Sequence, residues 1–187
     1  MTVKPLDATT WDAYAALIVR HNGIWGGCWC MAFHEQGIGK QSTAEQNRRA
    51  KECLVREGRA HAALVFDDEL CVGWCQYGRV DELPRAKFKK YEQGLDRIPD
   101  WRIPCFFVDR TYRRRKVASL ALESALVEIA RHGGGLVEAF PEKTEDRKFI
   151  MNFAYHGTVG MFERRGFSTI RQLSMHNWVV RKNIAGV

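Results

Sequence analysis

One stretch of the chain limits its fold more than any other. Between Pro104 and Leu126 the sequence reads PCFFVDRTYRRRKVASLALESAL, an apolar strand-like run, a basic loop and an apolar helix-like run. Five of the seven residues from Arg110 to Lys116 are basic. A buried strand that passes through a short loop into a helix is a unit of sheets covered by helices. The stretch therefore predicts a mixed α/β protein.

The flanking sequence predicts further elements of both kinds. A threonine cap and helical apolar spacing indicate a first helix, and a capping box of Ser42 and Glu45 indicates a second. Two β-patterned runs around Asp67 to Glu69 indicate a hairpin. The expected order is helix, helix, hairpin, strand, helix, strand, helix, strand, which implies an α/β or α+β fold with one mixed sheet. The expected ranges are helices at 9–23, 42–58, 117–132 and 158–167, and strands at 61–66, 70–80, 102–108, 136–140 and 168–180.

Length and composition describe one ordinary globular domain. At 187 residues, with 45% hydrophobic residues, the chain is expected to form a single domain over 1–187. The polar segment 81–101, which Pro84 and Pro99 bracket, is expected to be an insertion or a lid. The sequence shows no signal-peptide pattern and no apolar run long enough for a membrane span, so we expect a cytoplasmic protein.

The six cysteines are expected to be free thiols, as in other cytosolic proteins. The C-x-C spacing of Cys28 and Cys30 and the C-x-x-x-C spacing of Cys71 and Cys75 do not match the usual structural zinc sites, so we predict no metal. Free cysteine is usually buried, so Cys105 is expected to be a core residue rather than a nucleophile.

The basic loop is the main candidate binding site. Unpaired N–H groups and the positive end of the dipole make the start of a helix favourable for an anion, and the loop adds full charges. One short loop suits a pyrophosphate better than an extended nucleic-acid backbone. With a net charge of +7, a solvated charge run and a nucleic-acid-binding module stay open as alternatives.

Two motifs give the sequence a family resemblance. The stretch VDRTYRRRKVASLAL resembles the acyl-CoA loop of the GNAT superfamily of N-acetyltransferases, R/Q-x-x-G-x-G/A, with Arg113 in the first position and Ala118 in the last. Lys116 stands where the family usually has glycine. The stretch GTVGMFERRGF resembles the carboxy-terminal Y-E-K-x-G-F motif, with Phe162 in place of the tyrosine. The resemblance covers most of the chain.

The resemblance implies a fold, a co-substrate and a binding site. It implies a mostly antiparallel sheet with helices on both faces, splayed between two parallel strands, here 104–108 and 136–140. It also implies that acetyl-CoA binds in the splay, without a metal, and transfers its acyl group directly to an amine. The implied cofactor-binding residues are Phe106, Phe107 and Val108 for pantetheine and Arg113, Arg114, Arg115, Lys116, Val117, Ala118 and Ser119 for pyrophosphate.

Direct transfer needs a general acid and a general base. Because Phe162 replaces the family's usual acid, Tyr155, seven residues earlier and on the same face of a continuous helix, is the predicted acid; its alternative is a packing role. Glu138, a carboxylate in an apolar strand, is the predicted base if it faces a cleft rather than solvent. His156 is a second candidate base, and a water chain is a third.

The acceptor and other partners are less constrained. Aromatic residues from the loop after the first helix and from the hairpin suggest an acceptor wall of Trp25, Trp29, Phe33, Trp74 and Tyr77, or else a core. The sequence does not identify the acceptor amine, and it indicates no membrane partner. A homodimer stays open, as does a catalytically silent acyl-CoA-binding protein, since Lys116 and Phe162 occupy two functional positions of the family.

Overall fold

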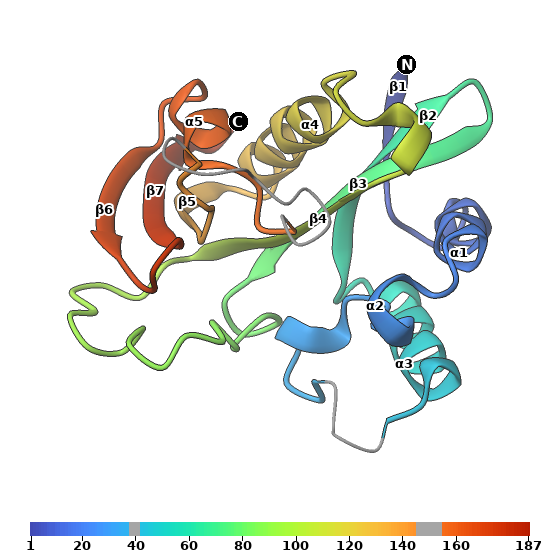
Figure 1. The fold of residues 1–187 in the computed structure, drawn as a ribbon, viewed down its shortest axis with the longest axis horizontal. Coiled ribbons are helices and arrows are strands. Elements are labelled where there is room, and N and C mark those ends of the chain that lie inside the picture. The colour runs from blue at the N-terminus through green and yellow to red at the C-terminus, as the bar shows by residue number, and fades with distance from the viewer. Residues whose placement is uncertain (38–41, 145–154) are drawn as a thin grey trace.

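A computed structural model describes residues 1–37, 42–144 and 155–187. Seven strands form one sheet in the order β1-β2-β3-β4-β5-β7-β6, in which β4 and β5 are parallel and every other neighbouring pair is antiparallel (Figure 1). This confirms the predicted mixed, mostly antiparallel sheet. The elements are β1 Thr2–Pro5, α1 Trp11–Arg20, α2 Ile24–Gly27, η1 Met31–Phe33, α3 Ala44–Arg56, β2 His61–Asp67, β3 Leu70–Arg79, β4 Trp101–Val108, η2 Arg110–Tyr112, α4 Val117–Arg131, β5 Gly134–Ala139, α5 Val159–Glu163, β6 Ser168–Gln172 and β7 Trp178–Ala185.

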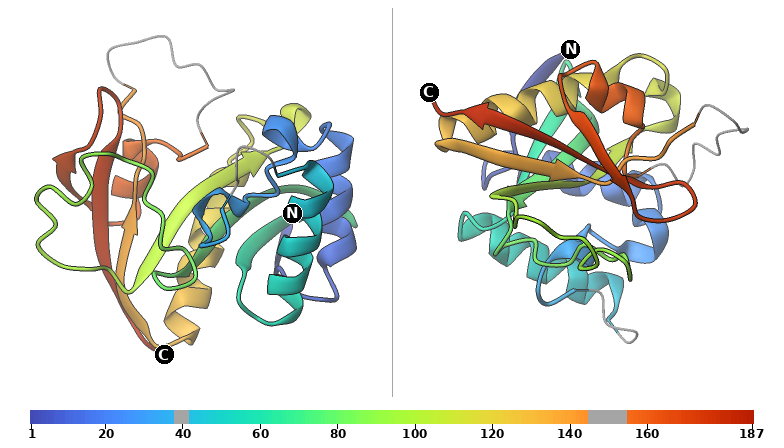
Figure 2. Two further views of the ribbon diagram at one scale, coloured as in Figure 1. Left: turned by 90° about the horizontal axis from the view of Figure 1, so that it is seen from below. Right: turned by 90° about the vertical axis from the view of Figure 1, so that its left-hand side faces the viewer.

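Helices cover both faces of the sheet (Figure 2). On one face α1 and α3 pack on alternate residues of β2 such as Leu64, and on the other face α4 packs on the intervening residues such as Val65. Because both faces are buried, β2 and β3 read as nearly continuous apolar runs rather than as alternating ones. No helix of the described ranges is long and apolar enough to cross a membrane.

The sheet opens between its two parallel strands. The pairing of β4 with β5 ends at Ile103 and Ala139, and the left view of Figure 2 shows the strands diverging beyond it. On the other edge of β4, Gln76 pairs with Cys105 but Gly78 pairs with Arg102, so β4 carries one extra residue, a β-bulge, at this point. Pro104, inside the bulge, has no N–H to donate to a ladder. The predicted splay is therefore present.

Several local predictions differ from the structure. The capping box of α3 uses Thr43 and Gln46, one residue later than predicted, because the Thr43 hydroxyl accepts the Gln46 N–H at 3.2 Å. The expected last strand is a hairpin of two strands, β6 and β7, whose turn contains Ser174. The short β1 was not predicted at all. The predicted helix around 158–167 is only α5, which begins at Val159.

The segment 81–101 has no helix and only the start of β4, and it is tied into the sheet by buried polar groups. The Arg102 guanidinium donates to the Leu83 carbonyl oxygen at 2.7 Å and to the Tyr91 hydroxyl at 3.0 Å. At its far end, Arg181 of β7 donates to Asp96 at 2.6 Å. The segment is thus an irregular wall beside β5 and β7, fixed at several points along its length.

Candidate functional site

A cavity of about 480 Å³ lies where the sheet opens. Its walls come from β4, the loop after it, the first turn of α4, the end of α1 with α2, and residues 155–161. Nine of the ten residues predicted to bind acyl-CoA line it: Phe106, Phe107, Val108, Arg113, Arg114, Lys116, Val117, Ala118 and Ser119. Segments distant in sequence therefore meet where the resemblance places the co-substrate.

The first turn of α4, whose N–H groups have no partner within the helix itself, borders this cavity. Lys116, the residue that precedes α4, makes no side-chain cap, and the first turn contains no acidic residue. Arg114 and Lys116 both have left-handed backbones, with φ of 64° and 62°. A left-handed residue followed by helical ones turns successive N–H groups toward one point, the arrangement that holds anions. Lys116 thus holds a left-handed conformation that glycine would adopt without a steric cost.

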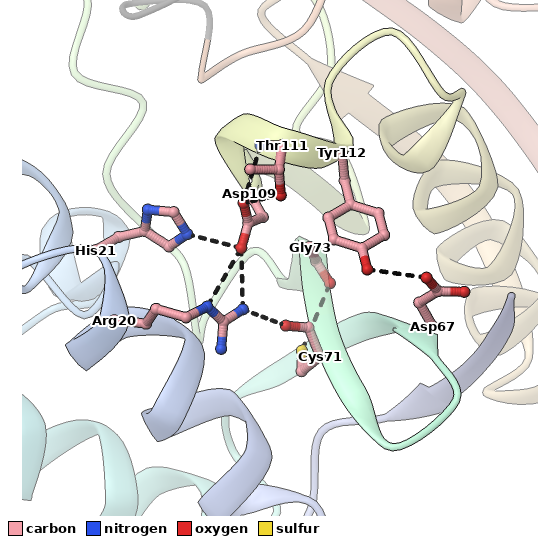
Figure 3. A network of polar contacts seen from close by, with 8 residues as sticks. All are labelled: Arg20, His21, Asp67, Cys71, Gly73, Asp109, Thr111 and Tyr112. Atoms are coloured by element: carbon pink, nitrogen blue, oxygen red, sulfur yellow. Dashed lines mark hydrogen bonds and ion pairs between the residues drawn. The ribbon is translucent and has the colours of Figure 1, made fainter.

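A buried carboxylate anchors the loop at its other end (Figure 3). The Asp109 carboxylate accepts the Thr111 N–H at 3.0 Å, and its Oδ2 lies 3.1 Å from the Arg20 guanidinium and 3.0 Å from Nε2 of His21. The Tyr112 hydroxyl donates to Asp67 of β2 at 2.9 Å. These contacts fix the loop to the end of α1 and to the β2–β3 hairpin.

The environment of Asp109 keeps it ionised. Burial alone would raise the pKa of its carboxyl group, but the contacts from His21, Thr111 and Arg20 outweigh burial and hold this pKa well below its usual range. The Arg20 guanidinium also donates to the Cys71 carbonyl oxygen at 2.8 Å, so it is held in place by two groups. The Asp109 carboxylate that anchors the loop is therefore negatively charged at neutral pH.

The open edge of β4 is partly filled by residues 155 and 156. The Phe106 N–H donates to the Tyr155 carbonyl oxygen at 2.7 Å. Within the bulge, the Pro104 carbonyl oxygen lies 2.7 Å from Nδ1 of His156. Successive residues of a strand direct their N–H and C=O groups to opposite edges. Asp109 donates its N–H to Val72 of β3, so the N–H and C=O groups of Val108 face the open edge. The edge near Val108 is the part of the strand that borders the cavity.

Tyr155 lies on the cavity wall, as an acid of the reaction would. Its half-buried ring contacts Trp25 at a centroid distance of 5.3 Å and His156 at 4.2 Å. Burial raises the pKa of its hydroxyl, so the hydroxyl keeps its proton at neutral pH. The predicted helical relation between Tyr155 and Phe162 is wrong, because Tyr155 lies in a turn before α5. It reaches the cavity through that turn instead.

His156 is buried behind Tyr155 among aromatic rings. Since a carbonyl oxygen only accepts, its contact with Pro104 assigns the proton to Nδ1. Burial lowers the pKa of His156 to about 4, so the ring is neutral at pH 7. The residue does not line the cavity. The hydrogen bond from His156 to Pro104 holds the bulge of β4 in place.

Glu138, the predicted base, is neither in the cavity nor in solvent. Its fully buried carboxylate accepts the Tyr91 hydroxyl at 2.6 Å through Oε1 and pairs with the Arg181 guanidinium at 2.8 Å through Oε2. Both oxygens are therefore engaged with groups of segment 81–101 and β7. A buried carboxylate needs such partners, and here they come from far along the chain.

Three further predictions can be compared with the structure. The Arg115 guanidinium packs on the Tyr112 ring at 5.1 Å and does not line the cavity, so it lies apart from the other nine residues. Cys105 lies in the core, 1% exposed. Of the proposed aromatic wall only Trp25 lines the cavity, while Trp29, Phe33, Trp74 and Tyr77 are core residues.

His21, a residue of the site that sequence reasoning missed, lies on the cavity wall beside Phe107, with ring centroids 5.1 Å apart. It follows α1 directly, and its neighbour Asp109 is far along the chain. The residues that follow His21 are also strained: Asn22, Ile24 and Trp25 all have left-handed backbones. Such strain in non-glycine residues often marks functional sites, but it is visible only in the structure.

Comparisons with known proteins show a likeness in fold and no likeness in sequence. No protein-family profile and no curated protein sequence matches the chain. Solved structures do match over nearly the whole chain. A structure of histone acetyltransferase HPA2 and related acetyltransferase from Corynebacterium glutamicum has a TM-score of 0.60 and 12% identity, and the alignment covers 100% of this chain and 97% of that one.

Two further structures show the same likeness. An acetyltransferase from Thermus thermophilus has a TM-score of 0.54 at 15% identity, covering 98% of this chain and 97% of that one. The ribosomal-protein-S18-alanine N-acetyltransferase from Escherichia coli has a TM-score of 0.51 at 10% identity, covering 100% and 95%. At such identities a likeness shows a shared fold and not a shared activity.

Proposed function

We propose that this chain, which has the fold of the GNAT acetyltransferases, is an acetyl-CoA-dependent N-acetyltransferase that moves an acyl group directly to a primary amine. The observation that carries the proposal is the cavity in the splay. It joins the start of α4, basic side chains of the loop and the edge of β4 near Val108 in one continuous wall. A long thioester with a pyrophosphate at one end fits such a wall.

The residues present fit the parts of acyl-CoA in order. The N–H groups of Val117, Ala118 and Ser119, with the charges of Arg114 and Lys116, suit a pyrophosphate. The backbone edge at Val108 suits an amide group of pantetheine, which would pair like an added strand; the Phe106 N–H is already donated to Tyr155, and the Phe107 backbone faces β3. The thioester then lies toward the bulge, near Tyr155.

The reaction requires one bond to form and one to break. The nitrogen of a neutral amine attacks the thioester carbon, the C–N bond forms, the C–S bond breaks, and CoA leaves as its thiol. The Tyr155 hydroxyl, protonated at neutral pH, donates a proton to the leaving sulfur. We do not assign the base to Glu138, because both of its oxygens are bound to other groups. The amine proton passes to solvent water, and solvent returns a proton to Tyr155.

Calorimetric titration with acetyl-CoA tests the proposal. We expect stoichiometric binding to the wild-type protein and to Arg115→Glu, and at least tenfold weaker binding to Arg114→Glu, because Arg114 lines the cavity and Arg115 does not. Release of the CoA thiol with a panel of amines then measures turnover. Equal affinities of the two variants for acetyl-CoA would mean that this loop does not bind the pyrophosphate.

A second function is favoured by one observation. Phe162, which has no hydroxyl, is fully buried where the resemblance expects the tyrosine acid. A silent acyl-CoA-binding protein would bind acetyl-CoA and release no thiol with any amine. The remaining alternative, a nucleic-acid module, would bind a short DNA duplex with steep salt dependence and would not bind acetyl-CoA. Running all three measurements at two salt concentrations separates these functions.

We also propose that the protein works in the cytoplasm. All six cysteines are free thiols in the structure, and five of them are buried. Burial raises the pKa of Cys71 to about 12, which keeps its thiol protonated and unreactive. A reducing compartment suits such a set of thiols.

A further inference from the structure

The cavity at the sheet opening is bordered by residues from both faces of the sheet. Phe106 and Phe107, neighbours in β4, both line it, and successive side chains of a strand point to opposite faces. Phe106 belongs to the same core as Val117 in the first turn of α4, whereas Phe107 packs against the core formed with α1 and α3. The pyrophosphate proposed for the first turn of α4 lies on the Phe106 side, so the Phe107 side is left for a second molecule.

Three aromatic rings line the cavity on the Phe107 side: those of Trp25, Phe107 and Tyr155. The centre of the Trp25 ring lies 6.2 Å from that of Phe107 and 5.3 Å from that of Tyr155, edge to face in both pairs. Trp25 is 43% exposed, and the other two rings are half-buried. A large aromatic side chain left exposed in a cavity offers a binding surface to an apolar group. Because Trp25 contacts Tyr155 directly, this surface adjoins the proposed acid within one cavity.

The loop that carries Trp25 is held in a strained conformation. The backbone of Trp25 is left-handed, with φ of 44°, which is uncommon for any residue with a bulky side chain. The Asn47 side chain of α3 donates to the Gly27 carbonyl oxygen at 2.8 Å, and the Tyr14 hydroxyl of α1 donates to the Trp29 carbonyl oxygen at 3.1 Å. Such strain persists only where the surrounding structure imposes it, and it concentrates at functional sites. Two helices thus hold the loop that presents the Trp25 ring to the cavity.

Charge also selects among amines. The described residues that line the cavity include no aspartate or glutamate, whereas four of them are cationic: Arg110, Arg113, Arg114 and Lys116. A polyamine would bring further positive charges to this wall without meeting a carboxylate from the described residues, which opposes its binding. A molecule with one amino group on an apolar body avoids this repulsion once its amine is neutral, the form that attacks a thioester.

We propose that the acceptor is a primary monoamine that carries an aromatic ring, and that Trp25 and Phe107 hold this ring. The proposal rests on the proposed acetyltransferase function, since it names the class of amine that receives the acyl group. Aromatic rings prefer edge-to-face and offset contacts, which the exposed Trp25 ring offers. A ring held on Trp25 brings its amine beside Tyr155, the group that protonates the leaving sulfur. The amine nitrogen takes the acetyl group, and the products are an N-acetyl amine and the CoA thiol.

The test compares four primary amines, with rates expressed per concentration of the neutral amine so that differences in basicity do not enter. 2-Phenylethylamine is compared with 2-cyclohexylethylamine, whose ring is not aromatic, with butylamine, which has no ring, and with spermidine, which carries further charges. We expect kcat/KM for 2-phenylethylamine to be several-fold above that for 2-cyclohexylethylamine and at least tenfold above those for butylamine and spermidine. A value for any of the other three amines that equals or exceeds that for 2-phenylethylamine would overturn the proposal.

Variants locate the preference on Trp25. Trp25→Ala should bring the ratio of kcat/KM for 2-phenylethylamine to that for butylamine close to one, whereas Trp25→Phe, which keeps a ring, should retain most of it. The control Leu70→Ala, at a side chain that is also 43% exposed but lies outside the cavity, should keep the full ratio. All three variants should keep the wild-type midpoint of thermal unfolding and the wild-type affinity for acetyl-CoA. An unchanged ratio in Trp25→Ala, or weaker acetyl-CoA binding by that variant alone, would overturn the assignment of Trp25 to the acceptor.

A binding measurement separates this proposal from the proposed function. Calorimetric titration with 2-phenylethylamine, without acetyl-CoA, reports on the ring site directly. Binding that Trp25→Ala loses and Leu70→Ala keeps supports the ring site even if no amine is acetylated, in which case the acetyltransferase function alone fails. Acetylation of butylamine as fast as that of 2-phenylethylamine leaves the function standing and overturns the ring site. The absence of both binding and turnover would overturn both.

Discussion

Lys116 adopts a backbone conformation that glycine adopts at no steric cost. Its φ of 62° and ψ of 13° place it in the left-handed region, directly before α4. The residue lines the proposed acyl-CoA cavity, where its positive charge is available to an anion. The GNAT motif usually has glycine at this position. Lys116 keeps a backbone conformation that suits glycine and differs from glycine in its side chain. A sequence pattern alone could not distinguish these two cases.

Replacing Lys116 by glycine separates backbone strain from charge. We expect Lys116→Gly to leave the free energy of unfolding unchanged or to raise it by up to about 1 kcal/mol, because relief of strain offsets the added entropy of the unfolded chain. Acetyl-CoA should bind several-fold more weakly. The control Arg115→Gly, at a residue without positive φ and outside the cavity, should lose about 0.5–1 kcal/mol and keep its affinity. Equal loss of stability in Lys116→Gly and Arg115→Gly would show that the left-handed backbone of Lys116 is not strained.

Tyr155 gives a prediction that concerns turnover rather than binding. If its hydroxyl protonates the leaving thiolate, Tyr155→Phe lowers kcat by about 100-fold or more and leaves the acetyl-CoA affinity nearly unchanged. The matched control is Tyr77→Phe, at a core tyrosine that does not line the cavity. Steady-state rates and calorimetry measure the two quantities. A Tyr155→Phe enzyme as fast as the wild type would transfer the acid role to water.

At the scale of elements, β4 connects the proposed acyl-CoA site to the fold. Its apolar pattern and the basic loop after it were readable in the sequence, because they depend on neighbouring residues. Its bulge and its anchor were not readable. The Asp109 carboxylate meets Arg20, 89 residues earlier, and no local pattern specifies such a contact. The splay itself was expected only through the family resemblance and not from the strand residues.

The anchor of β4 can be removed with a single substitution. Asp109→Asn leaves Arg20 and His21 beside a neutral group, so we expect the free energy of unfolding to fall by about 1–3 kcal/mol. Acetyl-CoA affinity should fall as well, because the loop that ends at Lys116 loses its attachment to α1. The control Asp96→Asn removes a carboxylate from segment 81–101 and should leave acetyl-CoA affinity unchanged. Unaltered affinity in both variants would show that the loop keeps its position without Asp109.

At the scale of the whole molecule, the arrangement of helices around one sheet followed from apolar periodicity, but the buried polar groups did not. Glu138 shows the difference. Its position in an apolar strand suggested solvent or a cleft, whereas Tyr91 and Arg181 satisfy it inside the protein. Segment 81–101 supplies one of these partners, so a segment with weak local signals is required by the interior of the sheet. Pairing between residues so far apart in the sequence can be recognised only in the structure.

Two buried histidines predict how the stability of the whole molecule depends on pH. Burial lowers the pKa of His34 to about 2 and that of His156 to about 4. Between about pH 4 and 6.5 the unfolded chain therefore binds more protons than the folded one, so the free energy of unfolding falls as the pH falls through this window. Asp109 acts at lower pH, because its pKa is depressed instead.

The expected loss is about 2 kcal/mol per histidine between pH 7 and pH 5. Chemical denaturation at several pH values measures it. His156→Gln, whose amide can still donate to the Pro104 carbonyl oxygen, should show a smaller loss over this range than the wild type, while the exposed His132→Gln should show the same loss. A wild-type stability that does not change between pH 7 and pH 5 would mean that these rings are not held neutral. In that event the tautomer assigned to His156, and with it the way the bulge of β4 is fixed at the opening of the sheet, would need to be revised.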